Sequence, residues 1–339
     1  MYCTGLEPSA APLLTDRNGT LNRPFNTSPI DNPSITSRIR AKSISLRIGS
    51  YFTAKTFDDE EHSNQPPRIM PELPEVETTL RGISPYLVGK TIREVTIRER
   101  RMRWPIPKEV DRLAGCKVKA ATRRAKYLLF ETDSGHLLLH LGMSGSLRIA
   151  TPSTEWRKHD HVAFRMSSGK ELRFYDPRRF GCVLFCKGDP MKHRLIRNLG
   201  PEPLDDAFNV NYLAALAKGK KVAIKQFIMN AHIVVGVGNI YASESLFMAS
   251  ISPKLSAGKV SKPRVQRLVD AIKAVLVNSI KMGGTTLRDF LHEDGQPGYF
   301  KQSLRVYDRE DDPCLKCETS VKRIIQSGRS TFFCPTCQR

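Results

Sequence analysis

The stretch MPELPEVE, residues 70–77, organises this chain. It reads like the beginning of a protein, although 69 residues precede it. When an initiator methionine is removed from in front of a proline, the proline becomes a secondary amine. An α-amino group titrates near about 8, so part of it is neutral at pH 7 and can attack a carbon atom to form a Schiff base. Pro71 is therefore a candidate nucleophile.

The same stretch also fits the first turn of a helix. Pro74 suits the first helical position, and Glu75 and Glu77 then lie in the positive first turn. Apolar side chains follow at helical spacing, namely Val76, Leu80 and Ile83. We expect a short helix over residues 74–83.

The composition favours a polyanionic partner. The 339 residues contain 54 Lys and Arg against 34 Asp and Glu, which gives a net charge of +20 and a pI near 9.8. Residues 1–69 hold eight basic and seven acidic side chains, so the remaining 270 hold 46 against 27. Nucleic acid is favoured over an anionic membrane because the chain shows no Lys-rich amphipathic helix and no long apolar span. A basic ribosomal protein is the alternative that charge alone leaves open.

The cysteines at the end of the chain have the spacing of a zinc site. They form two pairs separated by 16 residues, Cys314-x-x-Cys317 and Cys334-x-x-Cys337. Four protein thiolates bind Zn²⁺ tetrahedrally and leave no open position, so we expect one structural zinc ion. The basic loop between the pairs contains Lys322, Arg323 and Arg329, which suits either phosphate contact or a solvated hairpin tip. The other cysteines are scattered, at Cys3, Cys116, Cys182 and Cys186, which indicates a reducing compartment.

Residues 1–69 are rich in Ser, Thr, Asn and Pro, and we expect them to be disordered. Residues 34–55 are rich in Arg and Ser without acidic residues, which faintly resembles an organelle transit peptide, but their internal position weakens that interpretation. Three explanations stay open: a start codon placed upstream of the true one, a removable leader, or a retained extension. We favour the first.

After Gly89 the pattern changes to short segments rich in aliphatic and aromatic residues. We expect strands at residues 91–98, 117–122, 126–131, 136–141, 146–150, 161–166, 171–175 and 181–186. Turn signals such as Asp133-Ser134-Gly135 separate several of them. Strands that recur at this spacing predict a β-sandwich.

The sequence becomes helical after Gly-Pro-Glu-Pro at residues 200–203. We expect helices over 210–217 and 223–230, and a longer one with the apolar residues Val265, Leu268, Val269, Ile272 and Leu276 on one face. A glycine turn leads into a helix at about Asn239, where exposed amides and the Asn239 side chain suit a phosphate; an ordinary helix cap is the alternative. The expected domains are 70–200, 201–300 and 301–339.

Ten blocks of sequence, taken together, resemble the formamidopyrimidine-DNA glycosylase family, bacterial enzymes that excise oxidised purines. The blocks are PELPEVE (71–77), RRAKYLL (123–129), HLGMSGSLR (140–148), KHDHV (158–162), DPRRFG (176–181), LGPEPL (199–204), VGVGNIYASESLF (235–247), GGTTLRDF (283–290), DGQPGYF (294–300) and the zinc cysteines. The resemblance covers the chain from Pro71 to Arg339. It implies an α+β multi-domain fold: an N-terminal β-sandwich with a leading helix, a helix–two-turn–helix domain and a C-terminal four-cysteine zinc finger.

The resemblance also implies roles for individual residues. Pro71 matches the nucleophile and Glu72 its acid/base partner, while Lys126 and Arg329 match the groups that serve β- and δ-elimination. The matched backbone-binding positions are His159, Arg178, Lys220 and Asn239. Met143, Arg178 and Phe180 match a wedge that fills the space left by a flipped base, with Arg178 pairing to the orphaned cytosine. Without the resemblance, Met143 and Phe180 would be interpreted as core residues beside a strand.

The function that the resemblance implies is a bifunctional glycosylase and AP lyase of base excision repair. It would act on 8-oxoguanine and formamidopyrimidines in double-stranded DNA, as a monomer in the bacterial cytoplasm, with the loop at 295–300 as a lid over the flipped purine. Oxidised-pyrimidine repair of the endonuclease VIII type is an alternative. A non-catalytic binder of damaged DNA is another, because a retained segment 1–69 makes the Pro71 nitrogen a tertiary amide. A third alternative, a zinc-ribbon ribosomal or transcription protein, would account for the charge and the cysteines but not for the β-sandwich or the PELPEVE block.

Overall fold

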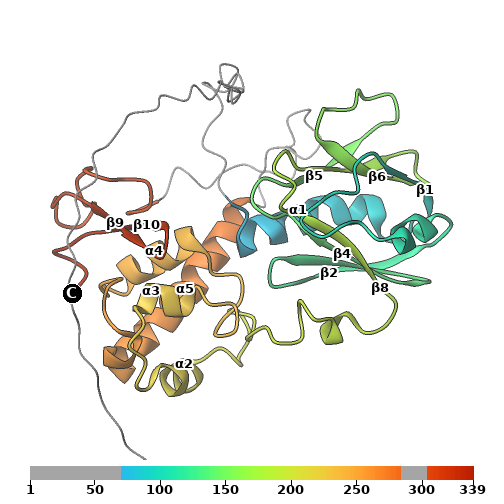
Figure 1. The fold of residues 1–339 in the computed structure, drawn as a ribbon. Helices are drawn as coiled ribbons and strands as arrows, with labels where there is room; N and C mark the ends of the chain where they lie inside the picture. Colours follow the sequence, from blue (N-terminus) through green and yellow to red (C-terminus); the bar gives the residue numbers. More distant parts are fainter. Residues whose placement is uncertain (1–69, 284–303) are drawn as a thin grey trace, which may run out of the picture. The chain divides into compact units, whose positions relative to one another are not determined.

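The computed structural model describes residues 70–283 and 304–339 (Figure 1). The predictions for residues 1–69 and for the loop at 295–300 fall outside the described residues. The helices are α1 (Leu73–Leu87), α2 (Val210–Ala217), α3 (Ile224–Ile228), α4 (Asn239–Met248) and α5 (Lys262–Gly283). The strands are β1 (Ile92–Ile97), β2 (Val118–Arg124), β3 (Tyr127–Thr132), β4 (Gly135–His140), β5 (Ser146–Ala150), β6 (Asp160–Met166), β7 (Glu171–Tyr175), β8 (Cys182–Cys186), β9 (Lys322–Gln326) and β10 (Arg329–Phe333).

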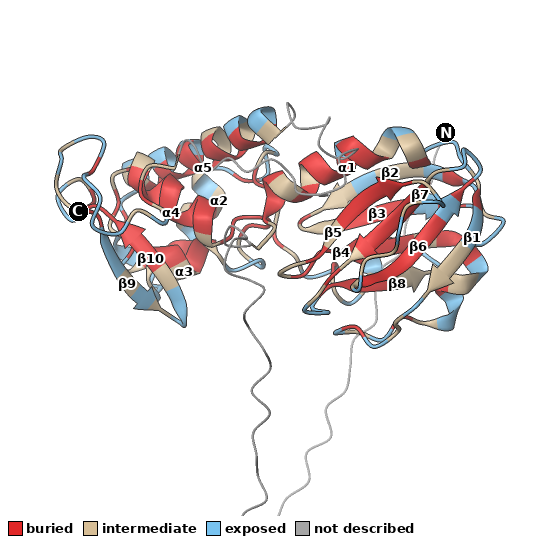
Figure 2. Cartoon of the chain, turned by 90° about the horizontal axis from the view of Figure 1, so that it is seen from above, coloured by how far each residue is buried: buried red, intermediate tan, exposed pale blue. Residues whose placement is uncertain are grey.

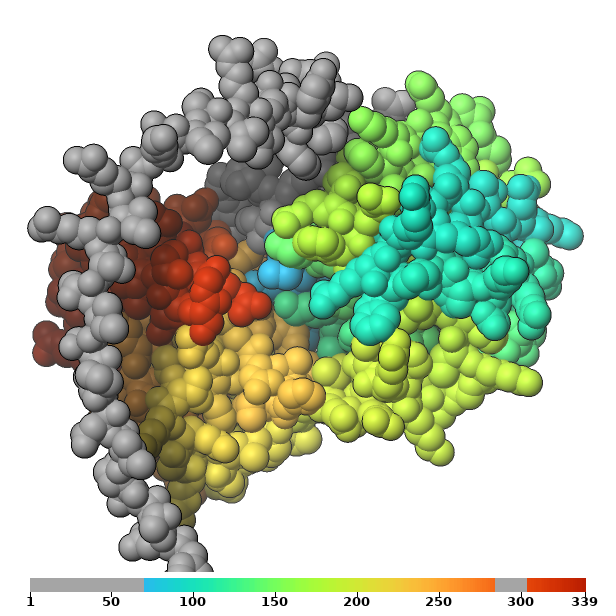
Figure 3. Space-filling view, viewed as in Figure 1, coloured from blue at the N-terminus to red at the C-terminus, as the bar shows by residue number. Residues whose placement is uncertain are grey.

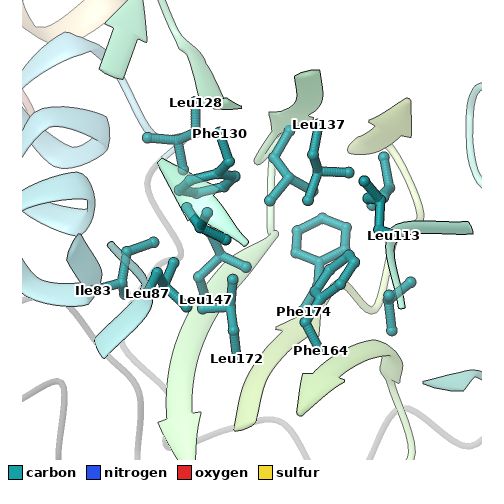
Figure 4. Close-up of a cluster of buried hydrophobic side chains, with 14 of the residues drawn as sticks. Ile83, Leu87, Leu113, Leu128, Phe130, Leu137, Leu147, Phe164, Leu172 and Phe174 are labelled. Atoms are coloured by element: carbon teal, nitrogen blue, oxygen red, sulfur yellow. The ribbon is translucent and has the colours of Figure 1, made fainter. Parts of the chain in front are cut away.

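Strands β1 to β8 build a sandwich of two antiparallel sheets. In the described residues each sheet has four strands, in the orders β1-β6-β7-β5 and β2-β3-β4-β8. Apolar side chains of both sheets meet in one core, which Figure 4 shows with Leu128 and Phe130 of β3 near Leu147 of β5. Figure 2 shows that the sheets carry long buried stretches with exposed residues mostly at their ends and edges. The predicted β-sandwich is confirmed.

Most strand limits agree with the sequence pattern. The strands expected at 146–150 and 171–175 coincide with β5 and β7, and the others differ from their predictions by one or two residues at an end. The pattern works here because most strand residues are buried, in β5, β6 and β7 on both faces, so runs of apolar residues mark the strands.

Helix α1 covers one side of the sandwich and is longer than predicted. It begins with a capping box in which Glu72 accepts from the backbone of Glu75 and the Glu75 carboxylate accepts from Glu72 N at 2.9 Å. The prediction ended the helix near residue 83, but it continues to Leu87 although Pro85 lies inside it. Proline removes one helical hydrogen bond. The buried side chain of Leu87 continues the apolar face, and its packing in the core extends the helix.

The helical part of the chain has an apolar core of its own. Helices α2 to α5 pack around Phe208, Phe227, Leu246 and Leu268, all buried. The hairpin β9–β10 packs on α4 through Phe332 and Phe247, so the zinc-finger segment (red) and the helical segment (yellow) form a continuous surface (Figure 3).

Candidate active site

Glu72 is the centre of the site because it joins the start of α1 to the start of α4. Its side chain is buried, with 1% of the residue exposed. Oε2 accepts from Gly238 N at 2.7 Å, and Oε1 accepts from Ile240 N at 2.9 Å. A carboxylate at a helix N-terminus is stabilised by the free amides and by the helix dipole. A Cβ atom at Gly238 would lie 2.2 Å from Glu72 Cδ, so only glycine permits this approach.

This arrangement decides between two interpretations of the turn before Asn239. The exposed amides at the start of the helix suit a phosphate, and an ordinary helix cap was the alternative. In the structure the amides of Gly238 and Ile240 donate to Glu72, and Tyr241 N lies 3.4 Å from its Oε2. The helix start is therefore occupied by a carboxylate of the chain itself, 166 residues earlier in the sequence.

Burial changes the acidity of Glu72. It raises the pKa of this carboxyl from 4.5 to about 6, while the charge of Lys126 opposes the rise and the nearby Glu75 adds to it. Burial also raises the pKa of Glu75, whose Oε1 accepts from the Tyr241 hydroxyl at 2.5 Å. The Tyr241 hydroxyl in turn lies 2.6 Å from Ser279 Oγ of α5. A carboxyl that titrates near pH 6 can take up or release a proton at physiological pH.

The predicted nucleophile and Lys126 lie beside this carboxyl. Pro71 is half-buried and directly precedes Glu72. Lys126 sits in the two-residue turn between β2 and β3, next to Ala125 with a φ of +56°. The positive charge of Lys126 opposes the rise in the pKa of Glu72, so the lysine lies near enough to interact electrostatically with this carboxyl.

Glu202, which the sequence did not identify, fixes the Lys126 turn. Its Oε1 accepts from Ala125 N at 2.7 Å and from Arg124 Nη1 at 2.7 Å. Its Oε2 accepts from Arg123 Nη1 at 2.6 Å. Glu202 belongs to the LGPEPL block, so the start of the helical part positions a hairpin of the sandwich.

A second cluster forms where the hairpin β9–β10 meets α3 and α4. Lys225 is 1% exposed, and its Nζ donates to Asn239 Oδ1 at 2.6 Å and to Thr331 Oγ1 at 2.8 Å. Burial lowers the pKa of Lys225 to about 8, Glu72 opposes this effect and Arg329 adds to it. Lys225 and Arg329 line the same cavity of about 190 Å³. No local pattern marks Lys225, because the groups that accept its hydrogen bonds lie on α4 and on the zinc hairpin.

Glu244 anchors the segment that enters the zinc finger. It is 2% exposed and accepts from the backbone N–H groups of Arg305, Val306 and Tyr307, each at 2.9 Å. A carboxylate that accepts three backbone hydrogen bonds is strongly held. The Tyr307 side chain is thereby placed beside Asn239, whose hydrogen bond opposes the rise that burial causes in the pKa of Tyr307.

The three predicted wedge residues come together. The Arg178 guanidinium lies 4.9 Å from the centre of the Phe180 ring. Met143 and Phe180 line one cavity of about 620 Å³, together with Arg103 and Arg179. Phe180 is 41% exposed, so the interpretation of Phe180 as a core residue is wrong.

The two remaining backbone-binding predictions stay predictions. His159 is half-buried before β6, and its ring packs edge-to-face on His161 and Tyr175. Lys220 is exposed after α2, and its carbonyl accepts from Gly258 N at 2.9 Å. Among the described residues, the lysine that hydrogen-bonds to Asn239 is Lys225.

The four zinc cysteines fit a metal ion. Their sulfur atoms all lie within 4.8 Å of one another, with Cys317 Sγ 3.5 Å from Cys334 Sγ and 3.4 Å from Cys337 Sγ. Four sulfurs at about 2.3 Å from one ion lie roughly 3.8 Å apart in a tetrahedron. The predicted structural zinc site is confirmed.

Across residues 70–283 and 304–339, no helix combines the length and the apolar character that crossing a membrane requires. Three family profiles match the chain: the formamidopyrimidine-DNA glycosylase N-terminal domain at residues 70–183, its H2TH domain at 199–291, and the zinc finger found in FPG and IleRS at 311–339.

Curated relatives and solved structures agree with these profiles. The chain is 57% identical to the formamidopyrimidine-DNA glycosylase of Alcanivorax borkumensis over 270 residues, which are 80% of this chain and all of the relative. The corresponding protein of Thioalkalivibrio sulfidiphilus is 55% identical over 271 residues, with 80% of this chain and all of the relative covered.

Two solved structures have the same fold. The Lactococcus lactis Fpg bound to DNA with an abasic site gives a TM-score of 0.73 at 31% identity, covering 79% of this chain and 99% of that one. The MutM (FPG) protein of Thermus thermophilus gives 0.70 at 37% identity, covering 79% and 98%. A sandwich with a buried acid at its first helix, an H2TH domain and a four-cysteine zinc finger define a DNA repair glycosylase. The chain belongs to the formamidopyrimidine-DNA glycosylase family.

Proposed function

We propose that this protein removes oxidised purines from duplex DNA as a bifunctional glycosylase and AP lyase, with Pro71 as its nucleophile. The observation that carries the proposal is Glu72, a buried carboxyl with a pKa of about 6 that directly follows Pro71. A general acid or base works best when its pKa lies near the working pH. Solved relatives hold DNA with an abasic site or with a Fapy-dG lesion, which supports this substrate class.

The chemistry begins at the sugar. The Pro71 nitrogen gives its lone pair to C1′ of the damaged nucleotide and releases its proton, while the base leaves with the electrons of its bond to C1′ and is protonated. Glu72 then donates a proton to the ring oxygen as the bond from C1′ to that oxygen breaks, which leaves an iminium on Pro71. Loss of a C2′ proton expels the 3′ phosphate, and a second elimination expels the 5′ phosphate. Water hydrolyses the iminium and frees Pro71.

The cationic side chains serve the two eliminations. Lys126, beside Glu72, donates a proton or binds a phosphate in the β-elimination. Arg329 serves the δ-elimination from the zinc hairpin, and the cavity that it shares with Lys225 suits a phosphate. Cationic contacts with DNA make binding weaken as the salt concentration rises.

The zinc ion is structural in this proposal. Held by Cys314, Cys317, Cys334 and Cys337, it fixes the fold of the hairpin and takes no part in proton or electron transfer. The hairpin then keeps Arg329 at its place beside Lys225.

The active species begins at Pro71. In the full-length chain the Pro71 nitrogen is an amide, whose lone pair is delocalised into the carbonyl, so it cannot form an iminium. The curated relatives match over their whole length with only 80% of this chain, which supports a functional unit without residues 1–69. We propose that this unit works in the bacterial cytoplasm, since the curated relatives are bacterial, and we expect it to be a monomer.

Borohydride trapping tests the proposal. Three proteins are compared on a duplex with 8-oxoguanine: the full chain, the chain beginning at Pro71, and a matched control with one alanine added in front of Pro71. We expect covalent protein–DNA adducts only with the second protein. Adducts at equal yield with all three would refute the role of the Pro71 nitrogen.

Competition decides the substrate. An excess of thymine-glycol duplex should leave excision of 8-oxoguanine largely unchanged. Preferential cleavage of the thymine-glycol strand would instead support the oxidised-pyrimidine alternative. Binding without any excision or adduct, by the chain beginning at Pro71, would support the non-catalytic damage binder.

A further inference from the structure

Three loops that carry predicted DNA contacts meet at one buried carboxylate, Asp176, which is 0% exposed. Its Oδ1 accepts from Ser144 Oγ at 2.6 Å, and its Oδ2 accepts from Gly181 N at 2.7 Å. Its backbone N–H donates to the His159 carbonyl at 3.0 Å, and its carbonyl accepts from His161 Nε2 at 2.8 Å. Asp176 therefore connects the loop before β6 with the turns on either side of the wedge.

Ser144 completes the connection between the two wedge turns. It directly follows Met143, and its Oγ accepts from Arg178 N at 3.3 Å while donating to Asp176. One hydroxyl and one carboxylate thus join the turn that carries Met143 to the turn that carries Arg178 and Phe180.

The two turns also touch through their backbones. Gly142 has a φ of +68°, and a Cβ atom there would lie 2.4 Å from Gly181 N and 2.5 Å from the Phe180 carbonyl carbon. Gly142 N donates to His140 Nδ1 at 2.9 Å. Burial, with a smaller effect of the Lys126 charge, lowers the pKa of His140 to about 4, so its ring remains a neutral acceptor at physiological pH.

A carboxylate is the side chain that this junction requires. Across the described residues no arginine or lysine forms an ion pair with Asp176, and a buried carboxylate without a cation is costly unless its oxygens are hydrogen-bonded. Both donors, the Ser144 hydroxyl and the Gly181 amide, need an acceptor at the same time. An amide side chain offers only one acceptor oxygen.

We propose that Asp176 and Ser144 are positioning residues that hold Met143, Arg178 and Phe180 in one fixed arrangement before DNA is bound. The inference rests on the proposed function, in which these three side chains replace the flipped nucleotide. Side chains that are already fixed lose less conformational entropy when they enter the base stack. The junction therefore acts on base extrusion and on recognition of the orphaned base, and not on the elimination chemistry at Pro71.

The test compares Ser144→Ala with Ser144→Thr, which keeps the hydroxyl, in the chain beginning at Pro71 and in the full chain. Three rates are measured under single-turnover conditions: excision of 8-oxoguanine opposite cytosine, excision opposite adenine, and cleavage of a duplex with a preformed abasic site. For Ser144→Ala we expect excision opposite cytosine to fall at least about tenfold, because the variant loses both hydrogen bonds of the Ser144 hydroxyl. Excision opposite adenine should fall less and abasic-site cleavage should change little, while the melting temperature should fall because Asp176 Oδ1 loses its donor. Ser144→Thr should restore the wild-type rates.

The outcomes are distinct. If the chain beginning at Pro71, with its wild-type residues, does not excise 8-oxoguanine, the proposed function fails. If the wild type is active and Ser144→Ala either matches it or loses excision and abasic-site cleavage in equal proportion, the positioning role is refuted. Should Ser144→Ala not fold, Ser144→Cys keeps the bulk with a much weaker hydrogen-bonding group, and the same ratios decide.

Discussion

The ionisation of Glu72 should weaken the folded state, and the size of the effect follows from its burial. The pKa of this carboxyl rises from 4.5 to about 6 on folding, and each tenfold change in proton affinity is worth about 1.4 kcal/mol. A group with a raised pKa stabilises the fold fully below pH 4.5, and this contribution is lost as the pH rises through 6. Ionisation of Glu72 therefore costs about 2 kcal/mol of stability at pH 7.

The perturbation that isolates this cost is Glu72→Gln. Glutamine does not titrate, so the variant lacks the loss of stability between pH 4.5 and 6. In the wild type, Gly238 N and Ile240 N each donate a hydrogen bond to one oxygen of Glu72. In the variant, the NH₂ group of the glutamine replaces one of these oxygens and leaves one of the two donors without an acceptor. That cost, about 1–3 kcal/mol, does not depend on pH. The variant should therefore be less stable than the wild type at pH 4, and this deficit should shrink by about 2 kcal/mol by pH 7.

Unfolding in urea, followed at several values of pH from 4 to 8, measures this difference. Glu109→Gln, at an exposed position, is the matched control, and its difference from the wild type should stay constant. A constant difference for Glu72→Gln as well would refute the reasoning, because the carboxyl would then titrate in the folded chain as it does in the unfolded one. Glu72→Gln should also lose base excision, since the general acid is gone.

Three further predictions concern the supports of the site. Glu202→Ala should lower stability by about 1–3 kcal/mol, because Arg124 and Ala125 N lose their acceptor while Arg123 keeps its ion pair with Glu77, and it should slow excision through the Lys126 turn; urea unfolding and excision rates check both. Lys225→Met should weaken DNA binding and flatten its salt dependence, measured by fluorescence anisotropy, because it removes a buried cation beside Arg329. Removal of zinc by a chelator should abolish cleavage, and readdition of zinc should restore it. The circular dichroism signal of the β-sandwich should stay unchanged throughout.

Features set by neighbouring residues could be predicted from the sequence, whereas contacts between residues far apart in the chain could not. Strands β5 and β7 were predicted to the residue because both are short apolar runs, buried along almost their whole length, and such a run is visible in a few neighbouring residues. The zinc cysteines were predicted for the same reason, since thiolate spacing is itself the signal. Pro71 was a candidate nucleophile from its place directly after Met70, whereas the role of Glu72 came from the family resemblance.

The supporting residues had no such signal. Glu202 hydrogen-bonds to Ala125, 77 positions away, and Glu244 to Val306, 62 positions away. A buried lysine such as Lys225 looks in the sequence like any surface lysine, because the groups that satisfy it lie on other elements. The length of α1 was missed because Pro85 is a local stop signal that tertiary packing of Leu87 overrides.

The distribution of the acids follows from the charge of the chain. A protein with a net charge of +20 that binds a polyanion gains nothing from carboxylates on the binding surface, because they repel phosphates. Inside, the two oxygens of a carboxylate can accept from several donors at once, whereas an amide side chain has one acceptor oxygen. Glu72, Asp176 and Glu244, each at most 2% exposed, join separate elements in this way: Glu72 and Glu244 accept from backbone N–H groups of distant segments, and Asp176 accepts from Gly181 N and the Ser144 hydroxyl. The turns and helix starts that carry the predicted DNA-contacting residues are thus held in place by buried acids, and neutralising any one of these acids should loosen a different part of the site.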